Sequence, residues 1–196
     1  MRRLGLGELR FGHGVPVSEG VSYREPDWDR AKWGEIPKAV AVWLPFAITE
    51  GTVLGVSQLT VSSNGCVIGL TGLTRPPDPA DARPPAGGIR FGVIWPDGTK
   101  LFSEMWIDGL HERPSAPVLR GPGNVVSNSS RQIYMSHWMW PLPPPGTLAM
   151  FAEWPERGIP ETSVELDAAV IRQAAREVVR IWEDDRPLRP NIIDHN

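Results

Sequence analysis

Residues 52–73, TVLGVSQLTVSSNGCVIGLTGL, carry the clearest local signal for the fold. Two runs rich in β-branched and apolar residues flank Ser63, Asn64 and Gly65. Asn-Gly between such runs is the strongest short-range hairpin signal, because both residues tolerate the positive φ angles of a tight turn. The stretch therefore predicts two antiparallel strands joined by a tight turn.

Two further segments extend the β pattern on either side. Residues 39–48, AVAVWLPFAI, are expected to form a strand whose Pro45 cannot donate to a ladder, which indicates a sheet edge or a bulge. Residues 89–95 alternate apolar and other side chains before the turn sequence PDG, and so predict a second hairpin. Between these segments, residues 74–88 contain five prolines and predict a long loop.

The composition fits one β-rich globular domain. The chain has 196 residues, of which 41% are hydrophobic and 22% charged, so it can bury a sizeable core. Its 21 prolines and 20 glycines favour turns and strands over helices. The formal net charge is −3 and the basic residues are dispersed, so we expect neither nucleic acid nor an anionic membrane as a partner.

The expected location is the cytoplasm of a bacterium. The single cysteine, Cys66, cannot form an intrachain disulfide, and no apolar run resembles a signal peptide or a membrane span. Of the 20 basic residues, 17 are arginine, which together with the alanine, proline and glycine content indicates a high-GC genome.

A C-terminal helix is expected to follow the strands. Thr162 and Glu165 have the spacing of a capping box, and apolar residues then recur at helical intervals as far as Trp182. The members of this stripe are Val164, Ala168, Ile171, Ala175, Val178 and Trp182. A helix with one apolar stripe must pack against another element of the fold.

The predicted fold is mainly β, an antiparallel β-sandwich or partly open barrel of about seven to nine strands with one amphipathic helix packed across it. Residues 1–38 are expected to wrap this domain or to be partly mobile, with Trp28 and Trp33 as anchors. The β domain with its C-terminal helix spans residues 39–182, and residues 183–196 form a frayed tail.

Residues 137–161, HWMWPLPPPGTLAMFAEWPERGIPE, hold three tryptophans and six prolines. If residues 131–140 pair with residues 147–154 across the loop 141–146, alternation sorts their side chains onto two faces. The expected core face carries Ile133, Met135, His137 and Met139 opposite Trp154, Ala152, Met150 and Leu148.

The other face of that hairpin is the candidate binding site. Tyr134, Trp138, Trp140 and Phe151 would form an aromatic strip suited to stacking on a sugar, a base or a side chain of a partner. The alternative is that the C-terminal helix lies over this strip and buries it, because large aromatic residues are usually covered.

Sequence motifs of the common enzyme classes are not found. His137 is either a general base or ligand, or a core residue with one hydrogen bond. Asp108, His111 and Glu112 have a spacing compatible with a weak metal or acid–base site, although such residues are commonplace in a polar loop. We therefore assign no catalytic residue and expect no metal and no cofactor.

The segment 138–182 resembles the C-terminal region of uncharacterised proteins of high-GC bacteria. The resemblance rests on a WPLPPPG loop followed by EWP, then GIxET, then a helix that begins near ELD. It covers about a quarter of the chain. It implies a strand–loop–strand–helix order in a bacterial cytoplasmic protein, and it implies no activity.

Three functions are compatible with these features. The leading hypothesis is a non-enzymatic interaction protein that binds a protein partner through the loops 74–88 and 107–130 or through the aromatic strip. The first alternative is a small-ligand or carbohydrate-binding β-sandwich module. The second is a small enzyme that uses His137 or the loop of Asp108, His111 and Glu112.

Overall fold

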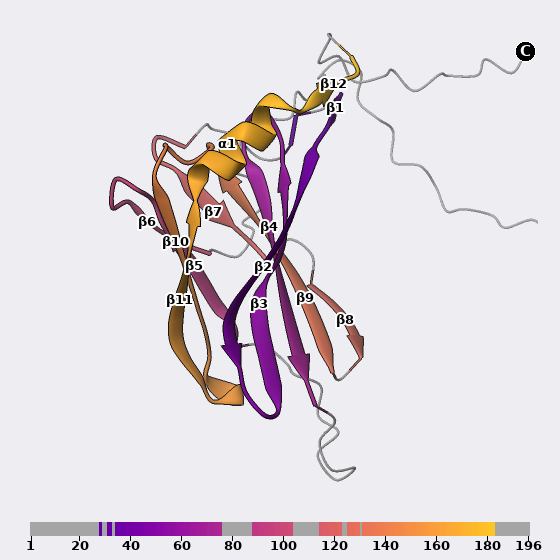
Figure 1. Ribbon diagram of the computed structural model, residues 1–196, viewed down its shortest axis with the longest axis vertical. Helices are drawn as coiled ribbons and strands as arrows, with labels where there is room; N and C mark the ends of the chain where they lie inside the picture. The colour runs from indigo at the N-terminus through magenta and orange to yellow at the C-terminus, as the bar shows by residue number, and fades with distance from the viewer. Residues whose placement is uncertain are drawn as a thin grey trace, which may run out of the picture.

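The computed structural model describes residues 28, 31–32, 34–75, 88–103, 114–122, 125–129 and 131–182 (Figure 1). This part of the chain forms mainly antiparallel β-structure with one α-helix near its C-terminal end. None of its helices is long and apolar enough to cross a membrane.

The larger sheet has six strands in the order β2-β3-β4-β9-β7, with β8 also paired to β9. Its strands are β2 (Lys38–Ile48), β3 (Thr52–Val61), β4 (Cys66–Thr74), β7 (Val118–Arg120), β8 (Val125–Ser129) and β9 (Gln132–Trp140). The second sheet has the order β11-β10-β5-β6. Its strands are β5 (Arg90–Ile94), β6 (Lys100–Phe102), β10 (Thr147–Trp154) and β11 (Ile159–Asp167), with a 3-10 turn, η2 (Pro155–Arg157), before β11.

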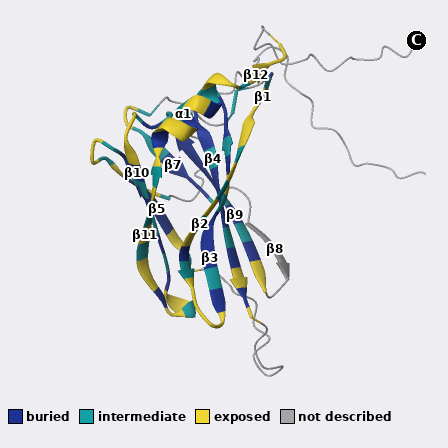
Figure 2. Ribbon diagram, viewed as in Figure 1, coloured by how far each residue is buried: buried dark blue, intermediate teal, exposed yellow. Residues whose placement is uncertain are grey.

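These two sheets are the layers of a β-sandwich, and Figure 1 shows helix α1 (Ala168–Arg176) lying across one end of it. The core lies between the layers and draws buried side chains from both, as the dark blue inner positions of Figure 2 show. The six-stranded sheet contributes Leu54, Val56, Leu59, Ile68, Leu70 and Met139, and the four-stranded sheet contributes Phe91, Val93, Leu148, Met150 and Trp154. The predicted fold class is confirmed in its sandwich form, because the described strands do not close into a barrel.

Both predicted hairpins are present. Strands β3 and β4 pair up to the contact between Val61 and Cys66, and the Ser62 amide donates to the Gly65 carbonyl at 2.9 Å. Strands β5 and β6 flank the PDG turn, where Gly98 has a φ of 86°. The expectation for Pro45 is also confirmed, because β2 is an edge strand with an irregular register beside that residue.

The predicted pairing of residues 131–140 with 147–154 is wrong. Strand β9 pairs with β4, β7 and β8, whereas β10 pairs with β5 and β11. The loop between β9 and β10 therefore crosses from one sheet to the other. Alternation correctly marked which side chains enter the core, but it does not specify the partner strand, and a six-residue loop can span the roughly 10 Å between packed sheets.

The predicted helix start at Thr162 is also wrong. Thr162 and Glu165 belong to β11, and α1 begins after Asp167, whose side chain accepts a hydrogen bond from the Ala169 amide at 2.9 Å. Val164 fits both a helical and an alternating pattern, and its pairing with Met150 on β10 favours the strand. Helix α1 buries Ala168, Ile171 and Ala174 against the open end of the core, beside β2, β3 and β11.

A short two-stranded ribbon completes the described fold. Strand β1 (Glu35–Ile36) pairs with β12 (Val179–Arg180), so a piece of the expected N-terminal segment meets a piece of the expected helix. The tail 183–196 and most of residues 1–33 lie outside the described residues.

Candidate functional site

The predicted aromatic strip is not formed as one surface, because Phe151 lies on the other sheet from Tyr134, Trp138 and Trp140. Trp138 and Trp140 lie on the outer side of β9, where they are buried together with Trp28. The Trp138 indole nitrogen donates to the Trp28 carbonyl at 2.9 Å, and the Arg120 guanidinium lies 4.6 Å from the centre of the Trp28 ring. The pair is therefore covered by a residue of the N-terminal segment and not by helix α1.

Of the other two members of the expected strip, Phe151 is separated from that pair, whereas Tyr134 lies four residues before Trp138 on the same face of β9. Phe151 lies on the outer side of the four-stranded sheet and makes an edge contact with Phe102 at 5.6 Å between ring centres. Tyr134 lies on the outer side of β9, where its hydroxyl accepts a hydrogen bond from Gln58 at 2.9 Å. Partial burial raises the pKa of the Tyr134 phenol.

His137 is enclosed in the core, on the face that alternation predicted. Its Nδ1 lies 2.8 Å from the Ser103 hydroxyl oxygen, and that hydroxyl donates its proton to the Gly121 carbonyl at 3.2 Å. The other ring nitrogen, Nε2, is buried and has no partner among the described residues. Burial lowers the pKa of His137 to about 4, so the ring is neutral near pH 7.

This environment does not resemble that of a general base, which must reach a substrate. The ring of His137 is 1% exposed and packs on Phe91, with 4.7 Å between ring centres. The second enzymatic candidate, Asp108 with His111 and Glu112, lies outside the described residues, as does most of the loops 74–88 and 107–130. Within the described part of the chain, no group of three or more possible ligands can hold a metal ion.

Within the described residues, the β1–β12 ribbon has an unusual surface, because it carries large apolar side chains in contact with solvent. Ile36 and Val179 face each other across the ribbon and are 55% and 54% exposed. Ile181 and Trp182 follow directly after the end of β12 and are 49% and 50% exposed. We call these four residues the ribbon patch; Figure 2 shows the ribbon and the adjoining end of α1 largely in the exposed colour.

The polarity of the ribbon is inverted relative to a normal surface strand. Glu35 and Arg180 face each other on the side opposite to Ile36 and Val179, and the Glu35 side chain is only 2% exposed. A charged group is thus turned inward and two aliphatic groups outward. Burial of the apolar residues instead would be the usual outcome, because transfer of apolar area out of water is what stabilises a surface strand.

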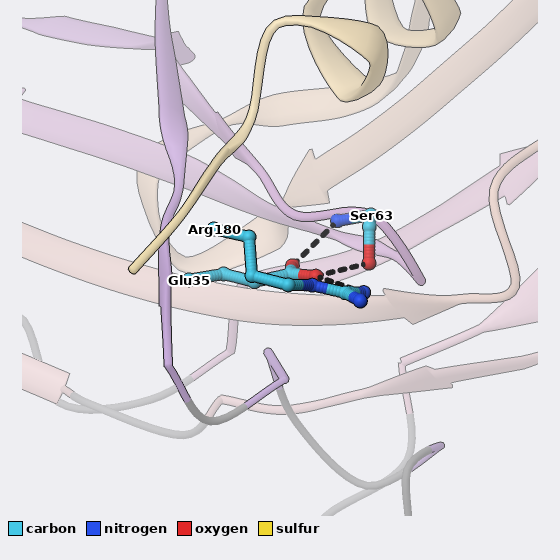
Figure 3. A network of polar contacts seen from close by, with 3 residues as sticks. All are labelled: Glu35, Ser63 and Arg180. Carbon is cyan, nitrogen blue, oxygen red and sulfur yellow. Dashed lines mark hydrogen bonds and ion pairs between the residues drawn. The ribbon is translucent and has the colours of Figure 1, made fainter. Parts of the chain in front are cut away.

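The inward carboxylate anchors the ribbon to the rest of the fold (Figure 3). Glu35 accepts hydrogen bonds from the Ser63 hydroxyl at 2.7 Å and from the Ser63 amide at 3.1 Å. The Arg180 guanidinium lies 3.5 Å from the same carboxylate. One side chain therefore connects β1, β12 and the turn between β3 and β4.

Two further contacts hold the ribbon in place. The Gly34 carbonyl accepts from the Ile181 amide at 2.7 Å, and Gly34 adopts a φ of 81°, a conformation that favours glycine. At the other side, the Lys38 ammonium lies 2.9 Å from the Glu177 carboxylate at the end of α1. The ribbon patch is therefore presented on a backbone that is fixed by specific polar contacts.

Sequence reasoning missed this patch for identifiable reasons. Glu35 and Ile36 lie in a polar segment without periodicity, so they gave no signal. Trp182 lies four residues after Val178 and matched a helical stripe, although the β-branched residues Val179 and Ile181 also fit a strand. The turn SNG was recognised, but a turn sequence does not reveal which distant carboxylate its Ser63 will bind.

Comparison of the chain with protein-family models, with curated proteins and with solved structures gave no match. The resemblance of residues 138–182 to uncharacterised bacterial proteins therefore stays a prediction.

Proposed function

We propose that the protein is a non-enzymatic interaction protein of the bacterial cytoplasm that binds a protein partner through the ribbon patch. The observation that carries the proposal is the inverted polarity of the ribbon, with Glu35 turned inward and Ile36 and Val179 turned outward. A buried carboxylate is costly unless it is hydrogen-bonded, and here three contacts serve to hold it. The apolar face is stabilised only when something else covers it.

The surroundings of the patch fit the anatomy of a protein interface. Its members are aliphatic and aromatic, and Trp182, which follows the end of β12, is of the residue type that most often dominates binding energy. Its margin carries the Lys38–Glu177 ion pair and Arg180, which are partly exposed. An apolar centre with a charged margin is the usual arrangement where a protein partner binds.

Four side chains are too small an area for a complete interface, since specific complexes bury about 1,200–2,000 Å² in total. The partner is therefore expected to extend over the neighbouring outer side of α1, where Val170 is 39% exposed. Because the ribbon is held by Glu35 in the free protein, little ordering is needed on binding, which favours affinity.

Affinity capture with matched baits tests the proposal. The baits are the wild-type chain, the double variant Ile36→Ser/Val179→Ser, and the control Ile48→Ser, which changes an isoleucine that is 67% exposed at the C-terminal end of β2. We expect at least one protein to be captured by the wild type and by the control, and to be at least tenfold depleted with the double variant. The Kd for the purified partner should then be similar for the wild type and the control, and at least tenfold higher for the double variant.

Capture with the same baits can also contradict the proposal. Equal capture by all three folded baits, or no captured protein with folded wild type, would overturn the proposal. Sedimentation velocity of the purified chain adds a further check. A dimer that dissociates in the double variant would show that the patch binds a second copy of this chain and not another protein.

A further inference from the structure

The outer side of the six-stranded sheet carries a second surface that is chemically unlike the ribbon patch. Trp43 on β2 is 48% exposed, and Tyr134 on β9 is half-buried. Between these rings lie polar side chains of β3 and β4, namely Ser57, Gln58 and Thr71. We call these five residues the sheet platform, and all five are uncharged.

A β-bulge creates the polar centre of the sheet platform. The register of β3 with β4 shifts between Val56 and Gln58. Val56 and Leu59 are both buried in the core, so the two residues between them, Ser57 and Gln58, lie together on the outer face. A regular strand would have placed one of the two in the core.

Two glycines let the aromatic rings lie close to the sheet. A Cβ at Gly55 would lie 3.1 Å from Cη2 of Trp43, and a Cβ at Gly69 would lie 2.7 Å from the Tyr134 hydroxyl oxygen. The rings thus cover backbone and not other side chains. The two rings therefore lie close to the backbone of the sheet, and the face of Trp43 that points to solvent stays accessible for stacking.

The polar groups are positioned by one another and keep unused hydrogen-bonding capacity. Gln58 donates to the Tyr134 hydroxyl at 2.9 Å, and Thr71 donates to the Ser57 hydroxyl at 2.8 Å. The Tyr134 hydroxyl still has its own proton to donate, and the Gln58 amide keeps a carbonyl acceptor. The platform therefore offers donors and acceptors in fixed positions beside aromatic surface.

We propose that the sheet platform binds a neutral oligosaccharide. A sugar ring presents an apolar C–H face that stacks on an aromatic ring and hydroxyl groups that pair with amide and hydroxyl side chains. The strands β2 and β9 are three ladders apart, about 14 Å at the usual strand spacing, so the platform accommodates more than one sugar unit. Its lack of charged members disfavours nucleic acid and acidic glycans.

Titration of the full-length chain with cellohexaose, maltohexaose and N-acetylated chitohexaose tests this site, followed by tryptophan fluorescence and calorimetry. The variants are Trp43→Ala, which removes the stacking surface, and Tyr134→Phe, which removes one hydroxyl. The matched control is Phe102→Ala, which removes an aromatic side chain that is 61% exposed on the other sheet. Thermal unfolding of each variant verifies that it folds.

We expect at least one of these neutral oligosaccharides to bind the wild type and the control equally. Affinity should fall at least tenfold in Trp43→Ala and a few-fold in Tyr134→Phe. Failure of all three probes, or equal affinity of folded Trp43→Ala, would overturn the proposal, as would a preference for the acidic probe oligogalacturonate. The Ile36→Ser/Val179→Ser variant should bind the sugar normally, so this test is independent of the protein-partner proposal.

Discussion

At the scale of single residues, the core contains a histidine that water does not reach. His137 has one polar contact, to Ser103, and its Nε2 is buried without a partner among the described residues. Such a ring is tolerated only in its neutral form, because a buried charge without a counter-charge is costly. The structure thus makes His137 a source of acid sensitivity in the fold.

The free energy of unfolding of the protein is therefore expected to decrease as the pH is lowered. The pKa of His137 is about 4 in the folded state against 6.5 for an ordinary histidine, so the unfolded chain binds this proton more tightly. The stabilising contribution is complete above pH 6.5 and is lost as the pH falls towards 4, by about 3 kcal/mol at most. Urea unfolding at a series of pH values measures it.

His137→Gln provides the control, because an amide can keep the bond to Ser103 without titrating in this range. Its free energy of unfolding should depend less on pH between 6.5 and 4 than that of the wild type. Identical pH dependence of the two proteins would show that His137 is not the group responsible.

The alternation of side chains predicted which residues are buried, but it did not predict which residues they contact. Met139, Met150 and Trp154 enter the core as expected, because alternation within a strand depends only on local backbone geometry. That Trp138 would be covered by Trp28 was not predictable, because the two residues are distant in the sequence and Trp28 stands in a segment without a regular pattern.

At the scale of secondary-structure elements, some segments of the sequence indicate one secondary structure, whereas others fit both a helix and a strand. The hairpin of β3 and β4 was predictable because two β-rich runs flank a short turn sequence, although neither Asn64 nor Gly65 adopts the positive φ on which the Asn-Gly signal rests. The boundary between β11 and α1 was not, because the segment 159–168 satisfies a capping-box pattern and an alternating pattern at once. Pairing with β10 decides between them, and that pairing is a tertiary interaction.

Substitution of the two candidate caps checks this boundary. Asp167→Ala removes the hydrogen bond to the Ala169 amide and should destabilise the protein by about 1 kcal/mol. Thr162→Ala should have a much smaller effect, because its hydroxyl only bonds the nearby Pro160 carbonyl on an exposed strand. The midpoints of urea unfolding compare the two variants. A larger effect of Thr162→Ala than of Asp167→Ala would support a helix that begins at Thr162.

The β1–β12 ribbon should depend on Glu35 more than the sandwich does. Glu35→Ala leaves the Ser63 amide and Arg180 without their carboxylate, which typically costs about 1–3 kcal/mol, and this loss is local to the ribbon. Hydrogen exchange should accelerate at the amides of Ile181 and Trp182, which bond Gly34, while exchange in β3 and β4 stays slow.

Glu50→Ala is a suitable comparison, since Glu50 forms an ion pair with Arg75 in which both side chains are well exposed. Such pairs contribute little to stability. If Glu35→Ala and Glu50→Ala gave the same exchange pattern, the anchoring role of Glu35 would be wrong.

At the scale of the whole molecule, the two proposed surfaces lie on separate parts of one sandwich. The ribbon patch stands at the end capped by α1, whereas the sheet platform lies on the outer face of the large sheet. The sequence prediction contained Tyr134 and a carbohydrate ligand as an alternative, but it included no residue of the ribbon patch and no other residue of the sheet platform. The sequence showed which aromatic residues were present, but their grouping depends on strand order, which long-range pairing determines.

Cys66 reports on the integrity of this sandwich. Its thiol is fully buried between Val61 and Met139, and burial raises its pKa to about 12. Because the thiolate is the reactive form, a disulfide reagent at pH 8 should leave the native protein unmodified for hours and label it stoichiometrically in denaturant. Rapid labelling of native protein would mean that the sheets separate readily.

The crossing between β9 and β10 also constrains the order in which the protein can fold during its synthesis. Strand β4 pairs with β9, and β5 pairs with β10. In each sheet, an early strand therefore pairs with a strand that is translated much later. Until then the early hairpin of β3 and β4 leaves one backbone edge open on the ribosome. We therefore expect the nascent chain to be prone to mispairing at this edge until β9 has been synthesised.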